Sequence, residues 1–166
     1  MTSNNCSIIK LIITDFDGVI LESESAKDQA FYECFSIFPE HVEEFMSYHS
    51  ANPVSERYKK FEYFYKKILK RKYNKDEKMW ISERFNNIVF EKVVAASFLP
   101  GALNFLKTYS KFAPIWIVSG TPKKQLLRVL KALNIEQYFQ RVFGTPPHKS
   151  IILANILGET NINPGN

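Results

Sequence analysis

The 166-residue sequence contains little cysteine and little glycine, with two and six residues respectively. Cys6 and Cys34 form no spacing typical of a metal site or a disulfide framework, so we expect free thiols in a reducing compartment. No apolar run approaches the roughly 20 residues that a transmembrane helix needs. The amino terminus also lacks a basic region followed by a long apolar segment. We therefore expect neither a signal peptide nor a membrane partner, and we expect a cytoplasmic protein.

The composition is typical of a globular domain with a substantial core. Hydrophobic residues make up 45% of the sequence and aromatic residues 14%. The net charge of +5 has a local origin, because residues 54–78 hold ten Lys and Arg against four acids. A basic stretch can attract nucleic acid or an anionic substrate. No nucleic-acid-reading motif accompanies it, so we interpret it as the solvated face of a helix and expect no nucleic-acid partner.

Three short, mostly apolar runs predict the strands of a parallel sheet: Ile8–Thr14, Pro114–Val118 and Arg141–Phe143. Helical patterns at about 101–109 and 148–158 lie between or after these runs. Strands that alternate with helices are typical of an α/β protein with crossover helices.

The longest predicted helical region, residues 19–98, interrupts this alternation. Its apolar residues repeat at steps of three and four, and prolines separate the repeating segments. Several amphipathic helices without strands between them indicate a small helical bundle. We therefore expect an α/β core formed by residues 1–18 and 99–166, with a helical insert at 19–98.

Two aspartates follow the first predicted strand directly, in the segment Asp15-Phe16-Asp17-Gly18. Side chains two positions apart on an extended segment point to the same side. Two converging carboxylates repel each other unless a cation joins them, and Mg²⁺ prefers oxygen ligands of this kind. One carboxylate can then act as a nucleophile while the other gives or takes a proton. Asp15 and Asp17 are therefore candidate catalytic and metal-binding residues.

The second predicted strand ends in Ser119-Gly120-Thr121-Pro122. We predict Thr121 as the N-cap of the next helix and Pro122 as its first residue. The Ser119 hydroxyl and the amides of Gly120 and Thr121 can then bind a phosphate at the start of that helix. Lys149 lies between the third predicted strand and the last helix, where its ammonium can neutralise phosphate charge at the same sheet edge.

The three segments, in this order, resemble motifs one, two and three of the haloacid dehalogenase (HAD) superfamily. The insert at 19–98 is similar to the helical C1 cap of its phosphoglycolate phosphatase/β-phosphoglucomutase-like branch. The resemblance implies a Rossmann-like parallel sheet, with Asp15 as the nucleophile that forms an aspartyl-phosphate and Asp17 as the general acid/base. It also implies Mg²⁺ as cofactor, held by Asp15 and the Asp17 carbonyl. Ser119 and Lys149 are then expected to grip the phosphoryl group.

Two positions bear on the reaction that the resemblance implies. Dehalogenase members and phosphonatases of the superfamily usually lack an acid at the position of Asp17, so its presence favours hydrolysis of phosphate esters. The β-phosphoglucomutase members carry a histidine ten residues after this acid, where this sequence has Lys27. We therefore expect a phosphatase rather than a mutase, acting on a small phosphorylated metabolite. The sequence leaves the identity of that metabolite and the oligomeric state open.

The sequence departs from the family pattern in its last part. Members of the family continue with a fourth motif, a Gly-Asp pair and a further acid, which completes the Mg²⁺ site. This sequence has four aspartates, and none follows Asp76. We therefore expect a core that lacks its C-terminal strands and a first strand with an exposed edge. The alternative to an active phosphatase is a truncated, weakly active or inactive HAD-like domain that serves as a fragment or an interaction module.

Overall fold

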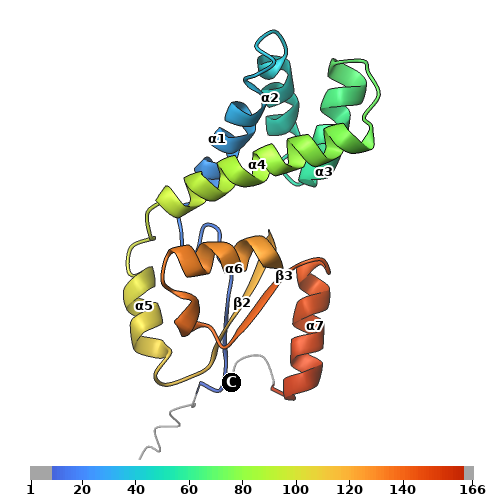
Figure 1. Ribbon diagram of the computed structural model, residues 1–166. Helices are drawn as coiled ribbons and strands as arrows, with labels where there is room; N and C mark the ends of the chain where they lie inside the picture. Colours follow the sequence, from blue (N-terminus) through green and yellow to red (C-terminus); the bar gives the residue numbers. More distant parts are fainter. Residues whose placement is uncertain (1–8, 163–166) are drawn as a thin grey trace, which may run out of the picture. The chain divides into compact units, whose positions relative to one another are not determined.

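The computed structural model describes residues 9–162, and its contacts divide the chain into two units (Figure 1). The first unit, which we call the α/β unit, contains the chain up to Ser23 and the chain from Ala96 onward. The second, the helical unit, is Glu24–Ala95. None of the helices within residues 9–162 combines the length and the apolar content that a membrane crossing requires.

The boundaries of the helical unit lie inside the expected insert at 19–98. Leu21 forms an antiparallel bridge with Phe98, and the Glu22 amide donates to the Ser97 carbonyl oxygen at 3.0 Å. These main-chain contacts tie both ends of the expected insert to the α/β unit. The assignment of 19–98 as a functional domain remains a prediction.

Three parallel strands form the sheet, in the order β1-β2-β3: β1 is Ile12–Thr14, β2 is Ile115–Pro122 and β3 is Arg141–Thr145. The expected α/β class is thus confirmed, although Ile8 of the expected first strand lies outside the described residues. All three strands end at the same sheet edge because they run parallel, and ligand sites of open α/β sheets lie beyond that edge. In the described sheet β1 has one neighbour, as an edge strand does.

Helices of the α/β unit pack apolar faces against the sheet. α6 buries Leu126, Val129 and Leu130, and α7 places Ile152 and Ile156 against Val118 of β2. The helical elements of this unit are α5 (Ala102–Tyr109), α6 (Lys123–Ala132), the short η2 (Glu136–Tyr138) and α7 (Lys149–Thr160).

The start of α6 differs from the sequence prediction. β2 continues through Pro122, which is the N-cap of α6, and the helix begins at Lys123. Thr121 therefore does not cap the helix. Its hydroxyl donates to the Asp17 carboxylate at 2.9 Å instead, because the extended backbone of β2 turns this side chain toward the end of β1.

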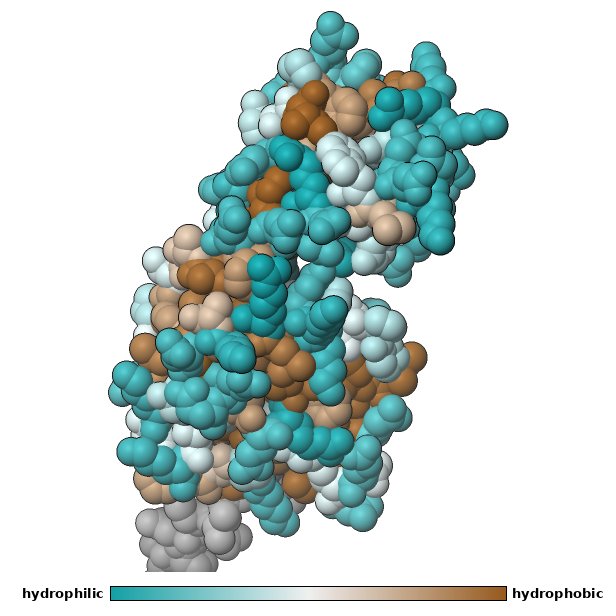
Figure 2. Space-filling model, in the orientation of Figure 1, coloured by the Kyte–Doolittle hydropathy of each residue, from teal (hydrophilic) through white to brown (hydrophobic). Residues whose placement is uncertain are grey.

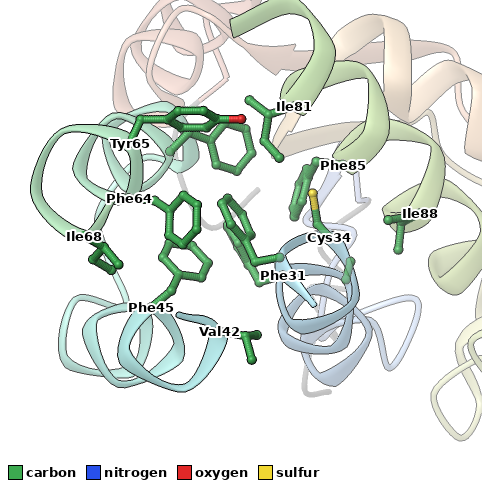
Figure 3. Packing of buried hydrophobic residues seen from close by; sticks show 13 residues of the cluster. Phe31, Cys34, Val42, Phe45, Phe64, Tyr65, Ile68, Ile81, Phe85 and Ile88 are labelled. Carbon is green, nitrogen blue, oxygen red and sulfur yellow. The ribbon is translucent and has the colours of Figure 1, made fainter. Parts of the chain in front are cut away.

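The helical unit is held together by an aromatic core (Figure 3). The rings of Phe35 and Phe45 lie 3.9 Å apart between centroids, and those of Phe31 and Phe85 lie 4.6 Å apart. Aromatic pairs add stabilisation beyond their buried area. The elements of the unit are α1 (Glu24–Phe35), α2 (Val42–Ala51), α3 (Arg57–Tyr63), the π-helical η1 (Phe64–Ile68) and α4 (Lys75–Ala95).

The surface of this unit is mostly hydrophilic on the face visible in Figure 2. Most lysines of the basic stretch at 54–78 are exposed, as expected for a solvated face, but Lys60 is buried. Cys34 is a buried free thiol, and burial raises its pKa to about 12. Cys6 lies outside the described residues.

Candidate active site

A tight turn after β1 carries both aspartates. Gly18 adopts a positive φ of 70°, which glycine tolerates without strain. Its amide donates to the Leu21 carbonyl oxygen at 2.8 Å, and the Ile20 amide donates to the Phe16 carbonyl oxygen at 2.8 Å. Phe16 and Ile20 are buried, so apolar anchors beneath the turn hold the polar residues at the sheet edge.

The Asp15 carboxylate contacts two groups. One oxygen accepts from the Phe16 amide at 2.7 Å, and the other accepts from the ammonium of Lys149, the first residue of α7. The side chains of Asp15 and Lys149 are 34% and 36% exposed. The pair thus leaves the carboxylate accessible to a small ligand and puts a positive charge beside it.

The Asp17 carboxylate is held by two hydroxyl groups. Its Oδ1 accepts from the Ser23 Oγ at 2.6 Å, and its Oδ2 accepts from the Thr121 Oγ1 at 2.9 Å. Ser23 is fully buried. Ser23 is not predicted from the sequence, because a serine in a polar segment carries no motif. The contact becomes visible only once the turn after β1 is folded.

The end of β2 lies beside Lys149. Ser119 is fully buried, and its Oγ accepts from the Thr121 amide at 3.0 Å. The Gly120 carbonyl oxygen accepts from the Thr145 hydroxyl at 2.7 Å. A Cβ added at Gly120 would lie 3.6 Å from Cε of Lys149. The lysine stem therefore lies within ordinary van der Waals distance of this position.

These contacts bring all six predicted site residues into one connected cluster. Asp15 contacts Lys149, which lies against Gly120, while Asp17 contacts Thr121, whose amide bonds to Ser119. The cluster unites segments that are 134 positions apart in the sequence. Their catalytic, phosphate-binding and metal-binding roles remain predictions.

The oxygen donors of Asp15 and Asp17 at this sheet edge suit Mg²⁺. Within residues 9–162 no three His, Cys, Asp or Glu side chains are grouped closely enough to enclose a metal. Mg²⁺ is commonly bound by one or two carboxylates together with substrate phosphate and water rather than by an all-protein cage. The Asp15 carboxylate and the Asp17 main-chain carbonyl fit that description.

Comparisons with known proteins agree with this geometry. The family model of haloacid dehalogenase-like hydrolases matches residues 9–161. No curated protein matches the sequence at a significant level.

Similar folds occur among solved structures. A predicted phosphoglycolate phosphatase from Haemophilus somnus is 15% identical with a TM-score of 0.68, and the match covers 96% of this chain and 75% of that one. A protein assigned as a β-phosphoglucomutase from Thermotoga maritima is 17% identical with a TM-score of 0.67, and the match covers 94% and 73%. CbbY from Rhodobacter sphaeroides, solved with phosphate, is 14% identical with a TM-score of 0.64, and the match covers 93% and 74%.

Each of these structures contains more residues than this chain, which spans 73–75% of their lengths. Identities this low show a common fold, whereas the family model matches nearly all of the described sequence. The chain therefore belongs to the haloacid dehalogenase-like hydrolase family.

Proposed function

We propose that the protein is a Mg²⁺-dependent phosphatase that hydrolyses a small phosphate monoester through an aspartyl-phosphate intermediate. The contact between Asp15 and Lys149 carries the proposal. It puts an accessible carboxylate nucleophile beside a cation that can bind phosphate oxygens. Membership of a hydrolase family supports a hydrolytic reaction.

In the first step, a carboxylate oxygen of Asp15 attacks the phosphorus of the monoester. A bond forms between this oxygen and phosphorus, and the bond from phosphorus to the ester oxygen breaks. Asp17, in its protonated form, donates its proton to the leaving oxygen, so an alcohol departs. Lys149 shifts from the carboxylate to the phosphoryl oxygens and balances their charge.

In the second step, water attacks the phosphorus of the aspartyl-phosphate. Asp17 takes the proton of the water, the bond from phosphorus to Asp15 breaks, and inorganic phosphate leaves. The Ser23 and Thr121 hydroxyls hold the Asp17 carboxylate in one orientation through both proton transfers. Residues 119–121 and Lys149 bind the phosphoryl group.

Mg²⁺, when bound, supplies positive charge to the phosphate and would be held by the Asp15 carboxylate and the Asp17 carbonyl. We also propose that the helical unit acts as a cap that excludes water during turnover. The free, buried thiol of Cys34 supports our further proposal of a reducing, cytoplasmic location.

Replacement of the nucleophile tests the mechanism. Asp15→Asn should reduce hydrolysis of p-nitrophenyl phosphate in the presence of Mg²⁺ to the background rate, because an amide cannot attack phosphorus. Asp76→Asn, which removes an exposed carboxylate of α4, is the matched control and should keep wild-type turnover. Circular dichroism should show that both variants remain folded. Unchanged turnover in Asp15→Asn would refute Asp15 as the nucleophile.

A second candidate function is a weakly active or inactive domain of the same family that serves as an interaction module. One observation favours it: the Asp15 carboxylate already contacts Lys149, and both carboxylate oxygens of Asp17 already accept hydrogen bonds from hydroxyl groups. Calorimetric titration of the wild type with Mg²⁺ separates the two functions. The phosphatase proposal requires a binding signal that Asp15→Asn removes, whereas the second function predicts no signal in either protein.

A further inference from the structure

The helical unit buries a lysine side chain. Lys60 in α3 is 2% exposed, and its Nζ lies 2.8 Å from Nδ1 of His49 and 3.4 Å from the His49 carbonyl oxygen. The ring of Phe31 lies 5.3 Å from the same nitrogen. Burial of an ammonium group destabilises a fold unless hydrogen bonds and a counter-charge compensate for the lost water.

His49 connects this lysine to a carboxylate at the surface. Its Nε2 lies 2.9 Å from Oδ1 of Asp28, whose side chain is 68% exposed. An ammonium can only donate and a carboxylate can only accept. The imidazole between them must therefore accept at Nδ1 and donate from Nε2. A neutral ring with its hydrogen on Nε2 satisfies both bonds, so the chain of three groups carries one positive and one negative charge.

Among the described residues, Asp28 is the carboxylate whose charge acts on Lys60. In α3 itself the Arg57 guanidinium donates to the Asn86 side chain of α4 at 3.0 Å. Cys34 of α1 and Tyr65 of η1 are buried, and burial raises the pKa of both, so the two groups stay neutral. The carboxylate of α1 and the imidazole of α2 are thus the groups that decide the charge state of the lysine.

We propose that Asp28, His49 and Lys60 form an acid-sensitive latch that holds α1, α2 and α3 together while the imidazole is neutral and loosens when the imidazole takes up a second proton. That proton would sit on Nδ1, 2.8 Å from the ammonium. The hydrogen bond from Lys60 would break, and the buried ammonium would lose its main acceptor. Acid would therefore weaken the contacts between the three helices.

The titration of Lys60 also makes the folded protein less stable at lower pH. Burial lowers the pKa of Lys60 below its ordinary value of 10.5, while the Asp28 carboxylate partly opposes the shift. At pH values between the lowered pKa and 10.5, Lys60 therefore binds more protons in the unfolded chain than in the folded one. The free energy of unfolding rises with pH across this window. A proton on Nδ1 of His49 would put a second positive charge 2.8 Å from the Lys60 nitrogen, so it would destabilise the folded unit in the same direction.

Urea unfolding of the full chain tests the proposal. In a Trp116→Phe background Trp80 of α4 is the sole tryptophan, so its fluorescence reports the helical unit. The unfolding midpoint should be higher at pH 8.5 than at pH 5.5 by about 0.5 M or more. Lys60→Met should abolish or reverse this difference, because the imidazole can then take up a proton beside Asp28. Lys59→Met is the matched control, since Lys59 is exposed, and it should keep the wild-type difference.

Equal pH dependences in the Lys60→Met and Lys59→Met variants would overturn the proposal. The ¹³Cε resonance of Lys60 provides a second measurement that needs no variant at position 60. It should titrate at lower pH than that of exposed Lys59, and titration at the same pH would overturn the proposal even if Lys60→Met failed to fold. Neither measurement depends on phosphatase activity, so failure of the proposed function would leave the result unaffected.

Discussion

At the scale of single residues, the orientation of the Asp17 side chain at the site depends on hydroxyl groups rather than on charges. The Asp17 carboxylate accepts one hydrogen bond from a buried serine and one from a threonine at the end of β2. Each bond fixes one carboxylate oxygen, so the direction in which Asp17 can transfer a proton is set by residues from two separate segments. Proton transfer by a correctly placed side chain contributes a factor of about 10²–10⁴ to catalysis.

Thr121→Val should therefore lower kcat about tenfold and leave KM nearly unchanged, because the variant keeps the shape of the side chain and loses the hydroxyl that orients Asp17. Thr121→Ser should restore most of the activity. Steady-state kinetics with p-nitrophenyl phosphate provide both constants. A rise in KM at constant kcat would show instead that the Thr121 hydroxyl binds substrate and does not position Asp17.

Gly144 in β3 supplies a second prediction at this scale. A Cβ at this position would lie 2.4 Å from the Lys123 nitrogen and from the Thr121 carbonyl oxygen, which are main-chain atoms and cannot move alone. Gly144→Ala should thus lower the free energy of unfolding by about 2 kcal/mol or more, as overpacking does. Gly158→Ala is the control, because this helical glycine has open space around it, and it should stabilise the protein by about 0.5–1 kcal/mol. Urea unfolding would measure the free energy of unfolding of both variants. A Gly144→Ala variant as stable as the wild type would contradict the close approach of β3 to the main chain at residues 121–123.

At the scale of secondary-structure elements, the helices of the helical unit are joined mainly by aromatic rings. Phe35 on α1 is fully buried and lies 3.9 Å from the ring of Phe45 on α2 and 4.5 Å from that of Phe64 in η1. Because these rings come from three different elements, one side chain connects most of the bundle. The short helices of this unit depend on such packing, since isolated helices of this length are marginal in water.

Phe35→Ala should destabilise the helical unit by about 3–5 kcal/mol, because it removes a large ring and leaves a cavity in the aromatic core. Phe112→Ala removes a ring that is 77% exposed, so its effect should stay within about 0.5 kcal/mol. Thermal and urea unfolding would compare the two variants. Similar losses in both would mean that the aromatic cluster is not the core of this unit.

At the scale of the whole molecule, the sheet has a free edge in the described part of the chain. β1 pairs with β2 alone, and Ile13 on β1 is 36% exposed. An edge strand presents unpaired main-chain groups that can pair with another chain. Apolar side chains beside such an edge strengthen that tendency.

Ile13→Lys should therefore reduce self-association at high protein concentration, because a charged side chain on an edge strand opposes pairing with a second chain. Val54→Lys adds the same charge at a residue that is 97% exposed in the helical unit, and it should leave association unchanged. Sedimentation velocity over a range of concentrations would compare both variants with the wild type. A wild type that stays monomeric at every concentration would contradict the prediction.

Much of the fold, and the gathering of the candidate site residues at one sheet edge, could be predicted from the sequence. Short apolar runs that alternate with amphipathic helices determine a parallel sheet, since strands buried on both faces need helices to cover them. Polar residues after those strands must then gather at one edge. Asp15, Asp17, Ser119 and Lys149 are therefore expected close together, and the contacts at the edge agree with this expectation.

The tertiary structure alone decided the partners of individual side chains. Ser23 donates a hydrogen bond to Asp17, and Thr121 also donates to Asp17 instead of capping α6. Lys60 is buried against His49, although the preceding Lys59 is exposed. Each of these contacts depends on the folded path of the chain, which brings the two partners within hydrogen-bond distance whether they are 6 or 104 positions apart. Periodicity and spacing describe which face of an element is apolar, but they contain no such distances. The sequence by itself thus determined which elements meet at the sheet edge, and only packing decided which atoms form bonds there.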